Sequence, residues 1–372
     1  MREFEYFLFE NFDADEEANN PLNPRRFLGR ETDPILSAVV QTPVGKCSYA
    51  ACCDQYGTDL VNKLINGGIL FCNGETLTVA CPVFLREDAA VLHREIRSKA
   101  SALVDTLQDC KDEIWKWCAK IDNGFSVELN MYHILCGMIF DGAFFDYLSD
   151  FGALATSRQH LSGLDYLTVI YENCEELQSL SDGLLCSYNR FVNEKCALQS
   201  FGDARGNRFD FYRFFRLIEQ GDVPNQFKSA ETCIKACGER LNKDRILDEV
   251  VSLAQTGSCI PALMELLELF GYAENGVLCV PVYSSEHRAI ITKVERIVES
   301  YMGVAMCELL AELAEKIQIT AVRHNVNRLE IANELYHIVF GFINEELVAR
   351  GLVAAPNDIP GEGRYLKCVE LY

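Results

Sequence analysis

The chain has 372 residues, of which 49% are apolar and 24% charged, so it has material for a folded core and lacks the composition of a disordered protein. At roughly 100–200 residues per domain, this length predicts two domains. Acidic side chains outnumber basic ones by 55 to 34, and the net charge of −21 opposes binding to phosphate backbones and to anionic membranes.

The first predicted element is a strand over the aromatic-rich run from Phe4 to Phe9. The polar stretch from Asn11 to Asp33 contains two prolines and predicts a loop. Within that loop, Arg25, Arg26 and Arg30 form the one local basic cluster of the sequence. A solvated loop is the simplest role for these cations.

Short helices and a hairpin follow the loop. The spacing of apolar residues predicts three short helices: Leu36–Val40, Tyr49–Cys53 and Asp59–Ile65. Two strands, Ile69–Phe71 and Thr76–Phe84, are then joined by Asn73-Gly74, a strong hairpin turn because both residues tolerate positive φ. Helices followed by a two-stranded ribbon resemble a winged helix in layout.

Longer helices come next. A helical pattern starts at Ala90, and an apolar helix begins at Tyr132. Residues 155–205 are predicted to form a helical connector between two halves of the chain, chiefly over Leu164–Ser179 and Leu184–Leu198.

The second half has a similar order of elements. Two helices are predicted before its hairpin: Ile246–Ala254 and Pro261–Phe270. The hairpin turn is Asn275-Gly276, and a long helical pattern starts at Ala289. A faint echo of the N-terminal aromatic strand at Phe209–Phe215 would begin this half, and Arg364–Tyr372 predicts a terminal strand.

Two sequence blocks recur in the same order in both halves. The hairpin with its following proline, Pro82, matches the hairpin before Pro281, and Tyr132–Ile139 matches Tyr336–Ile343. We therefore predict an α+β, mainly α fold with two diverged repeats of a winged-helix-like unit, each followed by long helices. The predicted divisions are a first repeat over 1–154, the helical connector over 155–205 and a second repeat over 206–372.

Two histidines occupy matching positions in the repeats. A functional pair of His133 and His337 would form a metal or acid–base site where the halves meet. The interpretation that we favour is that each flanks the core and is hydrogen-bonded to the backbone or to a carboxylate. No other histidine or acid stands beside either one at the spacing of metal ligands.

Seventeen cysteines in a long chain rich in apolar residues predict free, mostly buried thiols rather than a disulfide scaffold. No C-x-x-C pair, P-loop or dinucleotide-binding glycine motif occurs, so we predict neither a metal nor a cofactor. The sequence also shows no signal peptide and no run of roughly 18–20 apolar residues, which predicts a cytoplasmic protein with no membrane partner.

A helix that reads DNA normally presents several Arg, Lys, Asn or Gln side chains. The helix before the first hairpin, roughly Tyr56–Asn66, offers Lys63 as its only base and also contains Asp59. Arg25 and Arg26 are the other candidate contacts with nucleic acid. The charge of this region disfavours nucleic acid as a partner.

Three functional hypotheses follow. The favoured one is a non-enzymatic interaction or regulatory protein whose winged-helix-like halves bind a protein partner or a second copy in a homodimer. The first alternative is a DNA-binding transcription regulator, which the helix and hairpin favour and the charge opposes. The second alternative is an enzyme whose site lies between the halves around His133 and His337.

Overall fold

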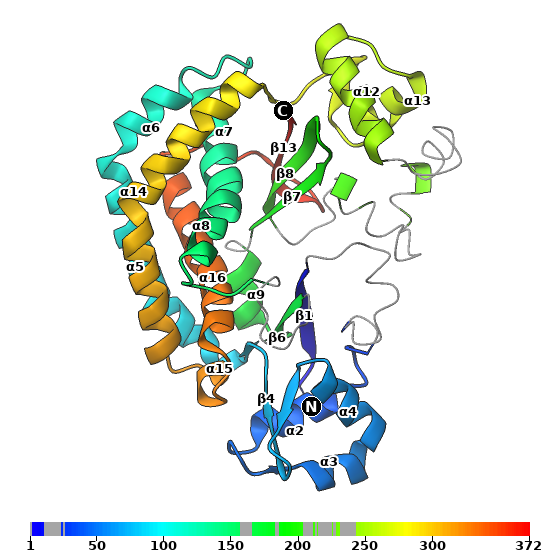
Figure 1. Cartoon of the computed structure of the whole chain (residues 1–372), viewed down its shortest axis with the longest axis vertical. Coiled ribbons are helices and arrows are strands. Elements are labelled where there is room, and N and C mark those ends of the chain that lie inside the picture. Colours follow the sequence, from blue (N-terminus) through cyan, green and yellow to red (C-terminus); the bar gives the residue numbers. More distant parts are fainter. Residues whose placement is uncertain are drawn as a thin grey trace. The chain divides into compact units, whose positions relative to one another are not determined.

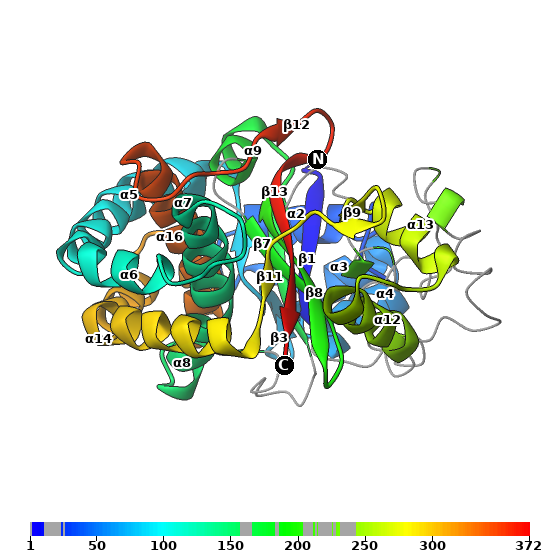
Figure 2. The same ribbon diagram turned by 90° about the horizontal axis from the view of Figure 1, so that it is seen from above.

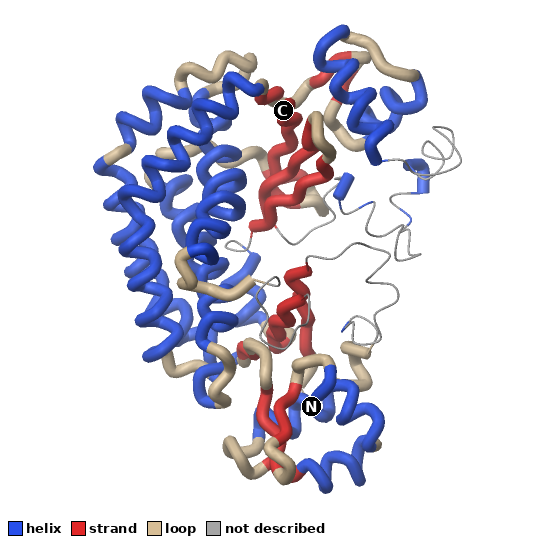
Figure 3. Tube along the Cα trace, viewed as in Figure 1, coloured by secondary structure: helices blue, strands red, loops and turns tan. Residues whose placement is uncertain are grey.

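The structure is a computed structural model. It describes residues 2–10, 24, 27–156, 166–182, 186–203, 211–212, 214, 225, 228–230 and 243–372. It is about 58% helix and 17% strand, which confirms the predicted α+β, mainly α class (Figure 3). Its contacts divide the chain into two compact units, each built from three separate stretches. Unit 1 is Met1–Asp105, Asp146–Leu184 and Met302–Ile343, and unit 2 is Thr106–Phe145, Leu185–Tyr301 and Asn344–Tyr372.

Unit 1 contains six strands among its described residues (Figure 1). They are β1 (Phe4–Glu10), β2 (Cys47–Ser48), β3 (Leu70–Cys72), β4 (Thr76–Val79), β5 (Val83–Phe84) and β6 (Tyr166–Glu172). The helices wholly within it are α2 (Asp33–Gln41), α3 (Tyr49–Tyr56), α4 (Thr58–Asn66), α9 (Glu175–Asp182) and α15 (Thr320–Arg323). Four helices are divided between the units: α5 (Arg86–Asp109), α8 (Phe144–Asp150), α14 (Ser285–Lys316) and α16 (Arg328–Ala349).

The remaining elements belong to unit 2. Its strands are β7 (Cys186–Val192), β8 (Cys196–Asp203), β9 (Ala273–Glu274), β10 (Val277–Leu278), β11 (Val282–Tyr283), β12 (Asp358–Ile359) and β13 (Gly363–Leu371). Its helices are α6 (Lys111–Cys118), α7 (Val127–Met131), the π-helical segment η2 (Tyr132–Ala143), α12 (Lys243–Thr256) and α13 (Pro261–Leu269).

The N-terminal part of unit 1 combines α2, α3 and α4 with a three-stranded sheet in the order β2-β4-β3. The Asn73 side chain accepts hydrogen bonds from the amides of Glu75 and Thr76, and Gly74 adopts a φ of 99°, so the predicted turn closes the hairpin. The three short helices and the hairpin are thus confirmed. The second predicted strand is not continuous, because Pro82 interrupts it and the residues that follow form β5 in a different sheet.

The main sheet of unit 1 has the order β1-β6-β5. Strand β1, predicted from its aromatic residues, lies antiparallel to β6, while β5 lies parallel to β6. The amide of Ile170 donates to the carbonyl of Pro82, and the amide of Asn173 donates to the carbonyl of Glu3. These two bonds fix the register at both edges of the central strand.

The main sheet of unit 2 has a similar arrangement with two more strands: its order is β11-β13-β8-β7, and β12 pairs with β13 (Figure 2). Strand β13, which confirms the predicted C-terminal strand, is antiparallel to β8 and parallel to β11. The amide of Val369 donates to the carbonyl of Pro281, and the amide of Tyr372 donates to the carbonyl of Lys195. The central strand is therefore fixed by the same pair of bonds as in unit 1.

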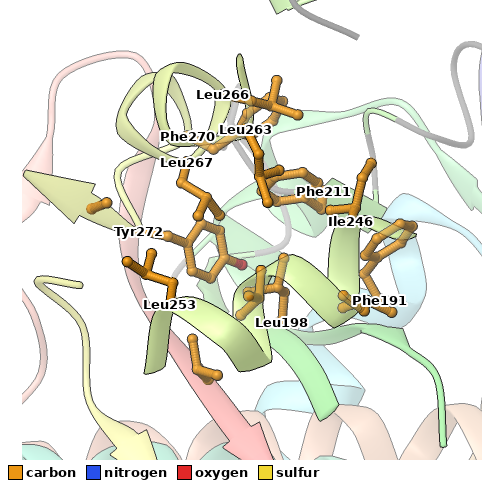
Figure 4. Close-up of a cluster of buried hydrophobic side chains, with 14 of the residues drawn as sticks. Phe191, Leu198, Phe211, Ile246, Leu253, Leu263, Leu266, Leu267, Phe270 and Tyr272 are labelled. Atoms are coloured by element: carbon orange, nitrogen blue, oxygen red, sulfur yellow. The ribbon is translucent and has the colours of Figure 1, made fainter. Parts of the chain in front are cut away.

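One face of the unit 2 sheet packs against α12 and α13. Ten of the buried side chains that form this core are labelled in Figure 4: Phe191, Leu198, Phe211, Ile246, Leu253, Leu263, Leu266, Leu267, Phe270 and Tyr272. On the other side, η2 approaches β8 closely at Gly137, where an added Cβ would stand 2.8 Å from the ring of Phe201. Only glycine permits this approach without a displacement of the Phe201 side chain.

Each unit combines a sheet from one half of the sequence with helices from the other half. In unit 1 the amide of Ala155 donates to the carbonyl of Leu329 in the first turn of α16. In unit 2 the hydroxyl of Tyr283 on β11 donates to Asn130 on α7. The two compact units therefore do not follow the three predicted ranges 1–154, 155–205 and 206–372. Those ranges describe the predicted sequence repeats and stay a prediction.

The helical connector predicted over 155–205 is wrong for most of its length. Among its described residues, β6, β7 and β8 are strands and only α9 is a helix. The six residues from Tyr166 to Tyr171 are buried on both faces of β6, and such an unbroken apolar run carries no periodicity that separates strand from helix. The strand suggested at Phe209–Phe215 is also wrong where it is described, since Phe211, Tyr212 and Phe214 are helical.

The helices that begin at Tyr132 and at Arg328 are buried all round rather than along one stripe. Residues 130–140 and 330–344 are buried without interruption. A helix segment covered on every side needs no polar face, which is why these two segments are apolar along their whole length. No single described helix is long and apolar enough to cross a membrane; α12 and α13 pass that test only as a pair, bent by 92°, and both contribute to the core in Figure 4.

Candidate functional site

His133, on η2, is the centre of a buried polar cluster in unit 2. Its Nε2 lies 2.9 Å from Sγ of Cys368 on β13 and 3.2 Å from Oε1 of Gln199 on β8. The thiol also lies 3.2 Å from that same Oε1. Nδ1 of His133 has no hydrogen-bond partner within the described residues. We therefore assign the proton to Nε2, which donates it to Gln199. This tautomer leaves an unpaired acceptor at Nδ1, which costs less than an unpaired N–H donor would.

Both members of the His133–Cys368 pair are uncharged at neutral pH. Burial lowers the pKa of His133 to about 4 and raises the pKa of Cys368 well above its usual value. Both side chains are wholly buried. A buried neutral thiol beside a neutral imidazole is a packing and hydrogen-bonding pair, not an activated nucleophile.

The cluster continues outward to charged groups. Nε2 of Gln199 donates to Oε2 of Glu370 at 2.6 Å, and the Glu370 carboxylate is paired with Arg288 and, at 3.6 Å, with Arg190. Arg190 in turn donates to the hydroxyl of Tyr372 at 2.5 Å. Two guanidinium groups thus compensate the buried carboxylate, as a charge removed from water requires.

His337, on α16 in unit 1, has a different set of neighbours. Its Nδ1 donates to the carbonyl of Asn333 at 2.8 Å and lies 3.9 Å from Oε2 of Glu334. The hydroxyl of Tyr171 donates to the other oxygen of Glu334. Burial lowers the pKa of His337 to about 4 and raises the pKa of Glu334 to about 8, so at neutral pH this contact is not an ion pair.

Burial also shifts the pKa of two further groups of unit 1, Glu330 and His324. Burial raises the pKa of Glu330, one turn before Glu334, to about 7. Burial and the charge of Arg323 lower the pKa of His324 to about 4, and its Nδ1 accepts from the amide of Val79 at 3.4 Å. Side chains with shifted pKa values are often found at functional sites, but burial in a structural network shifts pKa values in the same way. The shifts alone therefore do not identify a site here.

His133 and His337 lie in different units, and each is surrounded by partners of its own. Their contacts fit the interpretation as residues that flank the core, and a joint role for the pair stays a prediction. Lys63 is exposed in the last turn of α4. Arg25 and Arg26 lie outside the described residues.

The sequence revealed the histidines but not their partners. The partners of His133 lie on strands β8 and β13, which are far apart in the sequence and come together only when they pair. Local sequence carries no signal for this pairing, so Gln199, Cys368 and Glu370 could not be predicted. Glu330 and Glu334 had a signal: both are acidic residues within an apolar helical pattern. No three potential metal ligands lie together in the part of the chain that the structure describes.

The two hairpins expose apolar side chains. Phe71 on β3 is 59% exposed, and Val277 on β10 is 65% exposed. Neither Leu70–Val79 nor Ala273–Leu278 contains a lysine or an arginine, and each contains a glutamate. The tips of both hairpins are therefore acidic and apolar.

An open groove of about 480 Å³ lies beside the second hairpin. It lies wholly within unit 2, and its wall includes buried Lys367 and exposed Cys279. Most of its lining is apolar: Phe125, Leu269, Val280, Pro281, Ile359 and Leu366.

No family model matches the chain, and neither a curated protein nor a solved structure shows significant similarity to it.

Proposed function

We propose that this chain is a non-enzymatic interaction protein with two diverged winged-helix-like copies, whose hairpins bind a partner protein. The observation that carries the proposal is the chemistry of the hairpin tips. Each tip presents one exposed apolar side chain, Phe71 or Val277, beside a glutamate and without a cation. A partner protein could bind such a tip by burying its exposed apolar side chain in the interface.

Constant offsets support the duplication. Pro82 and Pro281 are 199 residues apart, and so are Ile170 and Val369, their hydrogen-bond partners. The same offset of 199 residues relates the starts of α5 and α14. At each start the backbone amide of the residue just before the helix donates to the side chain three residues later. These bonds are Leu85 N to Asp88 Oδ2 at 2.8 Å and Ser284 N to His287 Nδ1 at 3.2 Å.

The order of elements supports the winged-helix assignment of the first copy. Its chain runs helix, strand, two helices and a hairpin, and the first short strand, β2, pairs with the last, β4. In the second copy the described elements are α12, α13 and the β9–β10 hairpin. The proposal therefore rests more firmly on the first copy.

Regulation through DNA has less support, because phosphate contacts scale with the cations that a surface presents. The helix before the first wing carries Lys63 alone as a base. Catalysis around His133 has less support because both His133 and Cys368 are uncharged and wholly buried.

Site-specific photocrosslinking in cells tests the proposal. A benzoylphenylalanine residue at Phe71 or Val277 should give a discrete adduct with another protein. Val304, which is 70% exposed but outside the hairpins, is the matched control position and should give none. An adduct of twice the chain mass would identify a second copy as the partner.

Two outcomes would count against the proposal. Equal adducts at Val304 and at the hairpins would show non-specific capture of exposed apolar groups. Salt-sensitive binding of duplex DNA at micromolar protein in about 150 mM salt, lost in Lys63→Glu, would favour the DNA-binding regulator instead.

A further inference from the structure

Within the part of the chain that the structure describes, strand β1 is at the edge of its sheet and has one partner strand, β6. The amide of Asn173 donates to the carbonyl of Glu3, so the backbone groups of Glu3 face β6. Backbone direction alternates along an antiparallel strand. The N–H and C=O groups of Phe4, Tyr6 and Leu8 therefore point away from β6, at the outer edge of the sheet.

The corresponding strand of unit 2, β8, is covered at that edge. Tyr372 donates to Lys195 as Asn173 donates to Glu3, so Lys195 corresponds to Glu3 and Leu198 corresponds to Tyr6. On its far side β8 is paired antiparallel with β7, with Phe191 opposite Leu198. Unit 2 thus shows the length, direction and register of a strand at this position.

Strand β1, which has no described strand on its outer side, is more exposed than β8, which β7 covers. The residues of β8 from Cys196 to Gly202 are all buried, whereas those of β1 from Glu5 to Leu8 are all partly exposed. Two of these, Tyr6 and Phe7, are aromatic. An exposed edge with aromatic residues is a ready template for a further strand.

We propose that the outer edge of β1 binds an extended segment of a partner protein, antiparallel to Phe4–Glu10 and in the register that β7 takes on β8. Main-chain hydrogen bonds at Phe4, Tyr6 and Leu8 would supply affinity, and alternate side chains would supply specificity, as in other complexes formed by strand addition. The surface is separate from the hairpin tips.

The charge of the chain selects the chemistry of the segment. Glu5 and Glu10 belong to β1, and the whole chain carries −21, so a second copy is repelled and a segment with cations is attracted. Strand β7 has that chemistry: Phe191 is buried in the core, and Arg190 is paired with Glu370. The expected segment alternates apolar residues and carries at least one arginine or lysine.

A labelled synthetic peptide with the sequence of residues 187–195, SYNRFVNEK, serves as the probe. Added to the full-length protein, it should bind saturably by fluorescence anisotropy. Amide-resolved hydrogen exchange should then slow at Tyr6 and Leu8 while it stays unchanged at Phe7, whose backbone already faces β6. This alternating pattern requires no variant and distinguishes strand addition from contact with side chains.

Two variants at one position test the backbone requirement. Leu8→Pro removes the outward N–H, which an edge strand tolerates, and should weaken peptide binding about tenfold. Leu8→Ala keeps the N–H and should change binding about twofold or less. Both variants should match the wild type in thermal unfolding.

Several results would overturn the proposal. One is no saturable binding, and another is binding that Leu8→Pro leaves unchanged. Slow exchange at Tyr6 and Leu8 without peptide would mean that the chain covers its own edge, or that a second copy does if the effect depends on protein concentration. Because crosslinking at Phe71 and Val277 is a separate measurement, either proposal can fail without the other.

Discussion

Burial keeps the carboxyl group of Glu334 protonated at neutral pH. Its folded-state pKa of about 8 lies above the 4.5 of the unfolded chain, so between these values the folded protein binds more protons. The contribution of Glu334 to the free energy of unfolding is therefore complete below about pH 4.5 and is lost as the pH rises through about 8. Glu330, with a pKa of about 7, acts in the same direction.

We predict that Glu334→Gln removes much of this loss. Between pH 5 and pH 9 the wild type should lose about 2–4 kcal/mol of unfolding free energy that the variant retains, because the amide never ionises. Urea unfolding across this pH range measures the difference. Glu308→Gln, an exposed change on α14, is the control and should parallel the wild type.

The buried histidines act in the opposite direction. For His133, His324 and His337 the pKa falls from 6.5 to about 4 on folding. Their contribution to stability is complete above about pH 6.5 and is lost as the pH falls towards 4. Between roughly pH 4.5 and 6.5 the carboxyl and imidazole groups therefore oppose each other.

The hydrogen bonds of Cys368 give a second test at this scale. Cys368→Ala leaves a cavity and also removes a partner of His133 and Gln199. Cys118→Ala leaves a similar buried cavity, but the Cys118 thiol makes no hydrogen bond among the described residues. We expect Cys368→Ala to cost about 1–2 kcal/mol more than Cys118→Ala in urea unfolding. Equal losses would mean that the thiol only fills space.

At the scale of single elements, Asp88 links two helices. Its carboxylate accepts from the amide of Leu85 at the start of α5 and from the amide of Thr320 at the start of α15, and it is almost wholly buried. Among the described residues, His287 accepts one such bond, from the amide of Ser284, and it is half-buried.

Asp88→Ala should therefore destabilise more than His287→Ala. Loss of two bonds at a buried site predicts about 3 kcal/mol, and loss of one cap at a partly exposed site predicts about 1 kcal/mol. Thermal and urea unfolding compare the two variants. The reverse order would show that the buried hydrogen bond from Thr320 to Asp88 adds little to stability.

Short elements with strong local signals could be predicted from the sequence. The Asn73-Gly74 turn was sufficient to predict the first hairpin, and the spacing of apolar residues was sufficient to predict α4, because both signals are local. Strands β6 and β8 could not be predicted, because they are buried on both faces and lose the alternation that marks a strand. The partners of His133 required those strands to be paired first.

At the scale of the whole molecule, the halves of the sequence exchange helices. Strands of the first half and helices α15 and α16 complete unit 1, while η2 and the strands of the second half complete unit 2. Sequence repeats predict two similar halves, but carry no information about which helix packs on which sheet.

Cleavage between Leu184 and Leu185 tests this exchange. We predict that fragments 1–184 and 185–372, expressed together, form a stable one-to-one complex, and that each alone aggregates because its core lacks the other's helices. Co-purification and gel filtration measure this. A fragment that is monomeric and cooperatively folded alone would contradict the prediction.

The same exchange sets the order in which the chain can fold during its synthesis on the ribosome. Unit 1 lacks part of its interior until Met302–Ile343 has emerged, and unit 2 lacks β13 until the last residues are made. The common route, in which an N-terminal domain folds first while the rest is translated, is closed to this chain. Beyond the local sheet β2-β4-β3 and its helices, the apolar surfaces of each unit therefore lack their native partners until late in translation.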